Sequence, residues 1–105
     1  MLPDIVRVLC WDFDAWVVGS AADPGKSNIN DYDVIVPPGN WLAVANILHL
    51  LPITANSFGG WKVRLSAVTV DVWPCTINEF IARATTFPTY LYQPKCGLRL
   101  TCNPV

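Results

Sequence analysis

The chain has 105 residues and a mass of 11.6 kDa, so we expect residues 1–105 to form a single domain around one hydrophobic core. Hydrophobic residues make up 52% of the sequence and charged residues only 14%, which predicts some apolar surface that faces a partner. The net charge of -1 gives no overall field that would attract nucleic acid, so binding of nucleic acid would require a local basic patch.

The sequence shows no sign of a membrane segment or a zinc site. No apolar run approaches the ~18 residues of a transmembrane helix, and charges such as Asp4 and Arg7 interrupt the N-terminal stretch before a secretory signal could form. We therefore expect a cytoplasmic protein with no membrane partner. The four cysteines have no C-x-x-C spacing and only one histidine beside them, which predicts reduced residues in or near the core.

The first part of the chain predicts a helix and two strands. Residues 3–13 carry the apolar spacing of a short helix, and an unbroken apolar run at residues 15–19 predicts a strand buried on both faces. Residues 21–22 begin a helix that a proline and a glycine stop early. A second apolar strand is expected at residues 32–36, where the prolines and glycine of residues 37–39 end it.

The middle of the chain predicts a helix followed by a hairpin. Apolar residues form one stripe over residues 41–51, and Asn40 is suited to cap that helix. His49 is expected to be partly buried with a backbone or solvent partner rather than catalytic. Residues 61–65 alternate as a half-buried strand does, and a tight reversal leads into a strand at residues 68–73.

The last part begins with a capping box. Thr76 with Glu79 three residues later predicts the start of a helix over residues 77–84. Beyond it we expect a loop and two short extended segments that cover a sheet edge. The whole pattern predicts an α+β fold, with a mixed β-sheet of about four to five strands and helices packed on it.

Three aspartates fall on the predicted strands. Asp31 and Asp33 are two residues apart, so their side chains point to the same side of a strand. Asp71 lies inside an apolar run, where a carboxylate needs a partner because burying it alone is costly. A hard divalent cation would serve all three, since Mg²⁺ takes oxygen ligands. The alternative is an ion pair from Asp71 to Arg64 or Lys62 on the neighbouring strand.

Several other residues are candidates for contacting a nucleotide. A turn at Gly19 and Ser20 suits phosphate, because glycine lets backbone N–H groups approach closely and the hydroxyl adds a donor. Lys26 could reach a triphosphate from its loop, although exposed loop lysines are common. Trp61 and Tyr32 are candidates for stacking on a base, with core packing as the alternative.

The pattern hydrophobic-hydrophobic-Gly19-Ser20, ten residues, Asp31-x-Asp33, with Asp71 on a later strand, resembles the signature of the DNA polymerase beta-like nucleotidyltransferase superfamily. The resemblance covers residues 14–76. The runs F-G-G-W and V-D-V-W-P look like the heads of poly(A)- and CCA-adding enzymes, whereas the small size and spacing resemble minimal nucleotidyltransferases that modify a partner protein in toxin–antitoxin pairs.

The resemblance implies a nucleotidyltransferase-like fold and a catalyst that moves an NMP from an NTP, most often ATP, to a hydroxyl of RNA, a small molecule or a protein. Asp31, Asp33 and Asp71 would be the catalytic metal ligands for Mg²⁺ or Mn²⁺, and Gly19 and Ser20 would hold phosphates. A homodimer or a partner protein would complete the acceptor site. The alternative function is a non-catalytic module of the same fold that acts through protein–protein interaction.

Overall fold

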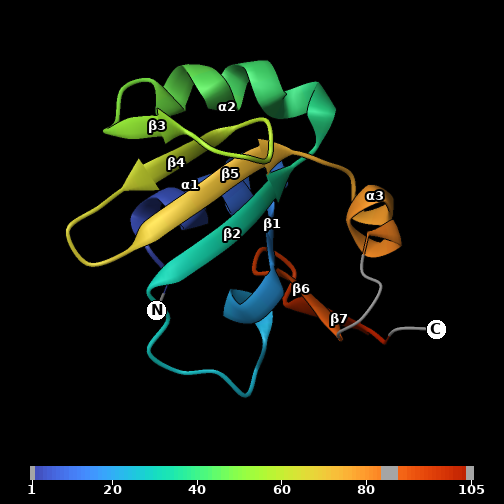
Figure 1. The fold of residues 1–105 in the computed structure, drawn as a ribbon. Helices are drawn as coiled ribbons and strands as arrows, with labels where there is room; N and C mark the ends of the chain where they lie inside the picture. The colour runs from blue at the N-terminus through green and yellow to red at the C-terminus, as the bar shows by residue number, and fades with distance from the viewer. Residues whose placement is uncertain (1, 84–87, 104–105) are drawn as a thin grey trace.

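The structure is a computed structural model that describes residues 2–83 and 88–103. Within these residues, seven strands form one mixed sheet in the order β3-β4-β5-β2-β1-β6-β7, accompanied by three α-helices (Figure 1). The elements in chain order are α1 (Asp4–Phe13), β1 (Trp16–Val18), the 3-10 helix η1 (Gly19–Ala22), β2 (Asp31–Val36), the 3-10 helix η2 (Pro38–Asn40), α2 (Trp41–Leu48), β3 (Ile53–Ala55), β4 (Trp61–Arg64), β5 (Thr69–Pro74), α3 (Ile77–Ala82), β6 (Thr89–Gln93) and β7 (Leu98–Cys102). The expected α+β class with a mixed sheet is confirmed.

The sheet in the described residues is wider than the four to five strands expected from the sequence. Three residues pair as β3 on the outer side of β4, a segment too short to show a period of two. At the other edge, β6 and β7 form an antiparallel hairpin, and β6 also pairs with β1. The two extended segments predicted near the end of the chain are therefore strands of the main sheet.

β2 and β5 form the centre of the sheet. They run parallel, and the chain between them forms η2, α2 and the β3–β4 hairpin. β5 pairs antiparallel with β4 on its other side, as the predicted hairpin requires, and β2 pairs antiparallel with β1. Asp71 therefore lies on a strand directly beside β2.

One face of the sheet is apolar and covered by α1 and α2. Its core includes fully buried valines of the central strands, among them Val34, Val70 and Val72. Leu9 of α1 and Leu48 of α2 are 0% exposed and belong to the same cluster. Burial of this apolar area is the main stabilising contribution to the fold.

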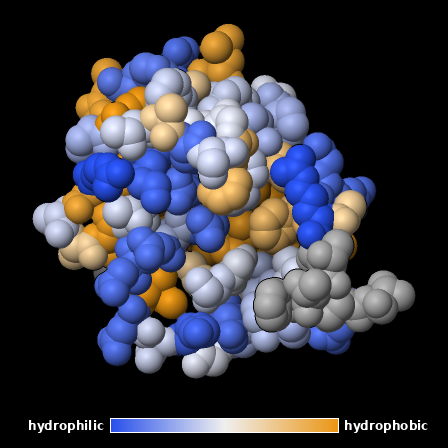
Figure 2. All heavy atoms as spheres, in the orientation of Figure 1, coloured by the Kyte–Doolittle hydropathy of each residue, from blue (hydrophilic) through white to orange (hydrophobic). Residues whose placement is uncertain are grey.

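The opposite face is divided between apolar and polar residues. Its apolar half contains Val18, Ile35, Trp73 and Leu91, against which α3 packs through residues that include Phe80. Its polar half carries the three aspartates, since residues that alternate with buried valines along a strand point to the other side. Figure 2 views this face, where hydrophilic residues over the sheet border a group of hydrophobic ones.

Three predicted details of α2 and its ends are wrong. The helix ends at Leu48 rather than residue 51, and the Asn40 side chain does not cap it. Instead, Asn40 Nδ2 donates to the Phe13 carbonyl oxygen at 2.9 Å and joins the start of α2 to the end of α1. His49 is exposed rather than partly buried, and its Nδ1 donates to the Ala45 carbonyl oxygen at 2.6 Å, so the expected backbone partner is present.

The capping box of α3 is confirmed. Glu79 N donates to Thr76 Oγ1 at 3.0 Å, and Thr76 N donates to Glu79 Oε1 at 3.2 Å. The backbone hydrogen bond from Thr76 lowers the pKa of the Glu79 carboxyl. The helix ends at Ala82, and the predicted last residue, 84, lies outside the described residues.

All four cysteines are free thiols. Cys10 and Cys75 are buried, as expected for reduced core residues, whereas Cys96 is exposed and Cys102 is partly buried. Burial raises the pKa of the Cys10 thiol to about 12, so this group stays protonated and unreactive near neutral pH. In the part of the chain that the structure describes, no helix has the length and apolar character needed to cross a membrane.

Candidate functional site

The three predicted aspartates gather on the polar half of the second face. In the parallel pairing of β2 with β5, Asp33 lies directly beside Asp71, and Asp31 lies beside Thr69. Residues in register on neighbouring strands point to the same side, so all three carboxylates share one face. Residues 31 and 71 are distant in sequence, and the strand register alone brings them together.

The Gly19 turn lies against the central carboxylate. Val18 is the β1 residue opposite Asp33, and Gly19 follows it with a φ of +71°. A Cβ atom placed on Gly19 would lie 3.3 Å from Asp33 Oδ2, tighter than ordinary van der Waals contact. Both the backbone conformation and the close approach therefore favour glycine at this position. Gly19 is also the first residue of η1, a single 3-10 turn that ends at Ala22. The helix is short, as the early proline and glycine predict, but it begins before the expected residues 21–22.

The environment of Asp33 disfavours its negative charge. Burial raises the pKa of its carboxyl, and the charges of Asp71 and Asp31 raise it further, whereas the ammonium of Lys62 acts in the opposite direction. None of the described residues donates a hydrogen bond to this carboxylate. Additional positive charge at Asp33 would therefore stabilise its ionised form.

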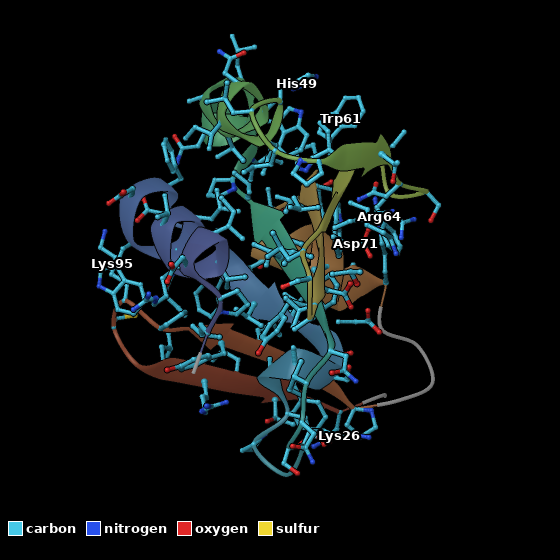
Figure 3. All side chains as sticks on the ribbon, turned by 90° about the vertical axis from the view of Figure 1, so that its left-hand side faces the viewer. Lys26, His49, Trp61, Arg64, Asp71 and Lys95 are labelled. Carbon is cyan, nitrogen blue, oxygen red and sulfur yellow. The ribbon has the colours of Figure 1, made fainter. Side chains whose placement is uncertain are left out.

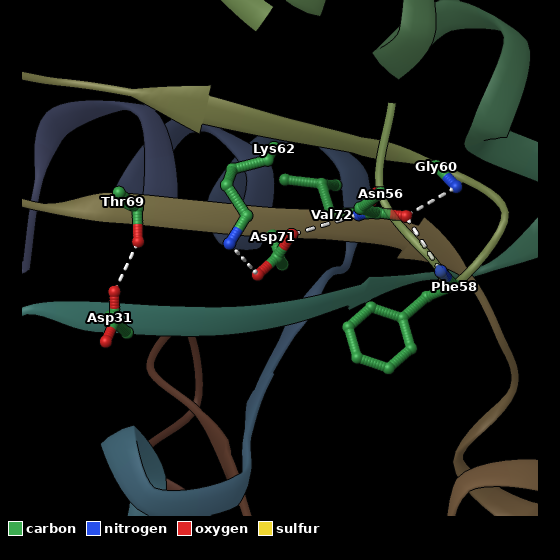
Figure 4. Close-up of polar contacts among 8 residues, drawn as sticks. All are labelled: Asp31, Asn56, Phe58, Gly60, Lys62, Thr69, Asp71 and Val72. Carbon is green, nitrogen blue, oxygen red and sulfur yellow. Dashed lines mark hydrogen bonds and ion pairs between the residues drawn. The ribbon is translucent and has the colours of Figure 1, made fainter. Parts of the chain in front are cut away.

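Asp71 is buried and has two partners from the chain. Its side chain is 12% exposed, and Lys62 Nζ lies 3.3 Å from its Oδ2 atom (Figure 4). Asn56 Nδ2 donates to Oδ1 at 3.2 Å. The sequence offers Arg64 and Lys62 as ion-pair partners for Asp71. The pair forms with Lys62, which lies directly opposite Asp71 on β4. Arg64 lies opposite Thr69 instead and makes no ion pair with any described residue.

Asn56 is a site residue that the sequence analysis does not identify. Its Oδ1 accepts from the backbone N–H groups of Phe58 at 3.0 Å and Gly60 at 2.9 Å, while its amide nitrogen reaches Asp71 (Figure 4). One side chain thus closes the 56–60 turn and orients a carboxylate. The available signal was the Asn followed by glycines, a pattern typical of a turn closed by an asparagine side chain.

The 56–60 turn also packs closely on β5. A Cβ atom on Gly60 would lie 1.9 Å from the Val72 carbonyl oxygen, so only glycine fits there. Phe58, which is 50% exposed, stacks on Trp73 with ring centroids 4.5 Å apart. The turn therefore places an aromatic stack beside the carboxylates on the same face.

Asp31 is the most exposed of the three aspartates. Its Oδ1 accepts a hydrogen bond from Thr69 Oγ1, across the β2–β5 pair. Among residues 2–83 and 88–103, no group of three His, Cys, Asp or Glu side chains is arranged to hold a metal ion. Asp71 instead faces Lys62 and Asn56. The available donors are nevertheless carboxylate oxygens on one face, which are the ligands that Mg²⁺ and Mn²⁺ take.

The remaining predicted contacts lie elsewhere. Lys26 is exposed on the loop before β2 and lies away from Asp71 in Figure 3. Tyr32 is 7% exposed and belongs to the apolar core, since it alternates with the aspartates of β2. Trp61 packs against the same core and meets His49 edge-on at 4.9 Å. Both rings therefore pack as the core alternative predicts, on the face away from the carboxylates.

Comparison with protein-family models, with curated proteins and with solved structures finds no match to this chain.

Proposed function

We propose that this protein is a metal-dependent nucleotidyltransferase, with a nucleotidyltransferase-like fold, that moves an NMP from an NTP to a hydroxyl acceptor. The observation that carries the proposal is the placement of Asp33 directly beside Asp71 on parallel strands, with the Gly19 turn against Asp33. Two carboxylates and a backbone turn that approaches one of them closely are parts that a metal-bound triphosphate requires.

In the proposed site, the aspartates bind metal and the Gly19–Ser20 turn binds phosphate. Asp31, Asp33 and Asp71 would hold Mg²⁺ or Mn²⁺, which when bound would neutralise phosphoryl charge and make the acceptor hydroxyl a better nucleophile. The Gly19–Ser20 turn would orient the terminal phosphates of the NTP, with ATP as the first candidate. Lys26 would contribute only through movement of its loop, because it is exposed in the structure and lies away from Asp71.

The acceptor would be RNA, a small molecule or a partner protein. The chain is acidic overall, which favours an acceptor other than a long polynucleotide. A homodimer or a partner protein would complete the acceptor site, since the carboxylate face is formed on a single sheet of a small domain. Cytoplasmic location remains part of the same proposal.

A second candidate function is a non-catalytic module of the same fold that acts through protein–protein interaction. One observation favours it: both oxygens of Asp71 already have partners from the chain itself, Lys62 and Asn56. A protein that had lost metal binding would keep such an internally neutralised carboxylate, because an isolated buried charge is costly.

Calorimetric titration of ATP, CTP, GTP and UTP separates the two candidates. The native chain and Asp33→Asn would be titrated with Mg²⁺ and again with EDTA, and Asp12→Asn, an exposed aspartate on α1, is the matched control. The proposal predicts metal-dependent binding that Asp33→Asn abolishes and Asp12→Asn retains. Absence of binding by a well-folded native chain would favour the interaction module.

A turnover assay completes the test once an acceptor is known. Asp31→Asn and Asp33→Asn should each abolish nucleotidyl transfer while the variants stay folded, as judged by circular dichroism and thermal unfolding. Retained activity in both variants would refute the assignment of the metal ligands.

A further inference from the structure

Lys62 occupies a particular place among the carboxylates. It lies on β4 directly opposite Asp71, which in turn lies directly beside Asp33 on β2. Its Nζ atom is 3.3 Å from Asp71 Oδ2, and its positive charge also offsets part of the rise in the pKa of Asp33 that burial, Asp71 and Asp31 cause. The ammonium is therefore close enough to serve two carboxylates that otherwise repel each other.

The two oxygens of Asp71 are held differently. Asp71 Oδ1 accepts from the side-chain amide of Asn56. The side-chain oxygen of Asn56 in turn accepts from two backbone N–H groups of the 56–60 turn, which hold the side chain in place. Oδ2 faces Lys62, a flexible side chain that is 33% exposed. Thus the asparagine contact is built into the fold, whereas the ammonium can leave by rotation of its four-carbon stem.

We propose that Lys62 is an internal counter-cation of the carboxylate site, and that it moves from Asp71 to a phosphate oxygen of the nucleotide when a divalent cation binds. This inference rests on the proposed function. The physical reason is that an ammonium and a divalent cation repel each other when they share one carboxylate oxygen. A bound triphosphate supplies the negative charge that the displaced ammonium then requires.

The consequence is that the ammonium of Lys62 affects the binding of the two ligands in opposite directions. Without nucleotide, Lys62 competes with the metal and weakens its binding. With nucleotide present, the same ammonium adds an ion pair to phosphate. Removing the positive charge of Lys62 should therefore strengthen the binding of metal alone and weaken the binding of nucleotide in the presence of metal.

Arg64 provides a matched control on the same strand and face. It is two residues from Lys62, is also cationic, and lies opposite Thr69 rather than Asp71. Replacing it removes the same unit of charge from the neighbourhood without removing the ammonium at Asp71. A difference between Lys62→Met and Arg64→Met thus measures position rather than net charge.

The experiment measures two binding constants for the native chain, Lys62→Met, Lys62→Arg and Arg64→Met. Mn²⁺ binding without nucleotide is followed by electron paramagnetic resonance, and ATP binding at saturating Mg²⁺ is followed by calorimetry. We expect Lys62→Met to bind Mn²⁺ about 5-fold more tightly, the size of a partly exposed ion pair, and to bind ATP more weakly by a similar factor. Lys62→Arg and Arg64→Met should stay within about 2-fold of the native chain in the Mn²⁺ measurement.

The outcomes distinguish this inference from the proposed function. If the native chain binds Mn²⁺ and ATP but Lys62→Met binds Mn²⁺ no more tightly, the counter-cation role of Lys62 is wrong and the proposed function stands. If Lys62→Met binds both ligands more tightly, transfer of the ammonium to phosphate is wrong. If neither the native chain nor any variant binds Mn²⁺ or ATP, both proposals are overturned. Lys62→Arg keeps the charge, so a change that Lys62→Met shows and Lys62→Arg does not is due to loss of the positive charge.

Discussion

The two faces of the sheet differ in what their residues contribute. The face under α1 and α2 is a continuous apolar core, in which Leu48 and the central valines are fully buried. The opposite face combines a smaller apolar cluster under α3 with three aspartates, a lysine and an asparagine. The same strands form both faces, because alternate residues point to opposite sides.

This difference shows how a small domain can tolerate crowded carboxylates. Placing Asp71 beside Asp33 is unfavourable for both, and the charge of Lys62 offsets only part of it. The apolar face stabilises the fold enough to hold the polar face in an arrangement that is not optimal for stability. Truncation of a core side chain on the apolar face should therefore destabilise the fold, whereas removal of a carboxylate charge from the polar face should relieve repulsion.

The largest expected effect is on the apolar face. Leu48→Ala should lower the free energy of unfolding by about 2–5 kcal/mol, because truncation of a fully buried side chain leaves a cavity between α2 and the sheet. Leu42→Ala, on the same helix but 76% exposed, should change it by less than about 0.5 kcal/mol. Urea unfolding followed by circular dichroism measures both, and equal effects would contradict the assignment of the core face.

The next effect tests the close packing of the 56–60 turn beside the polar face. Gly60→Ala should destabilise the fold by about 1–3 kcal/mol, because its Cβ would meet the β5 backbone at 1.9 Å. Gly39→Ala is the control, since nothing lies within 4 Å of its Cβ position. A Gly60→Ala variant as stable as Gly39→Ala in thermal unfolding would show that the turn packs differently.

A smaller effect concerns the helix that covers the apolar half of the second face. Thr76→Ala should cost about 1 kcal/mol, because the N-cap hydroxyl accepts from the Glu79 backbone N–H. Thr76→Ser keeps that hydroxyl and should be close to the native chain. Chemical unfolding of the three proteins tests this, and an equal loss in both variants would point to the methyl group rather than the cap.

The last effect is confined to a range of pH. The Asp33 carboxyl has a pKa raised above its ordinary 3.8, so the unfolded chain ionises before the folded one as pH increases. Native stability should fall through that window relative to Asp33→Asn, and the difference should stay constant at higher pH. Urea unfolding in EDTA from pH 3 to 8 measures the difference, with Asp12→Asn as the control. A native chain that gains stability relative to Asp33→Asn across the window would reverse the assignment.

Much of the fold follows from patterns that neighbouring residues determine. The strands at β1, β2, β4 and β5 and the early end of η1 follow from the local spacing of apolar, glycine and proline residues. The capping box follows from Thr76 with Glu79 three residues later. Local spacing also places Asp31 and Asp33 on one side of a strand. It does not reveal β3, because three residues carry too little periodicity, and it misassigns Asn40, whose partner is a distant carbonyl group.

By itself, the sequence determined which residues are polar on otherwise apolar strands, because alternation is a property of each strand alone. Only the tertiary structure decided that Asp33 lies beside Asp71, that Lys62 rather than Arg64 pairs with it, and that Asn56 holds its other oxygen. The physical reason is strand register. Register depends on the pairing of segments far apart in the chain, and a shift of one residue would turn every one of these side chains to the opposite face.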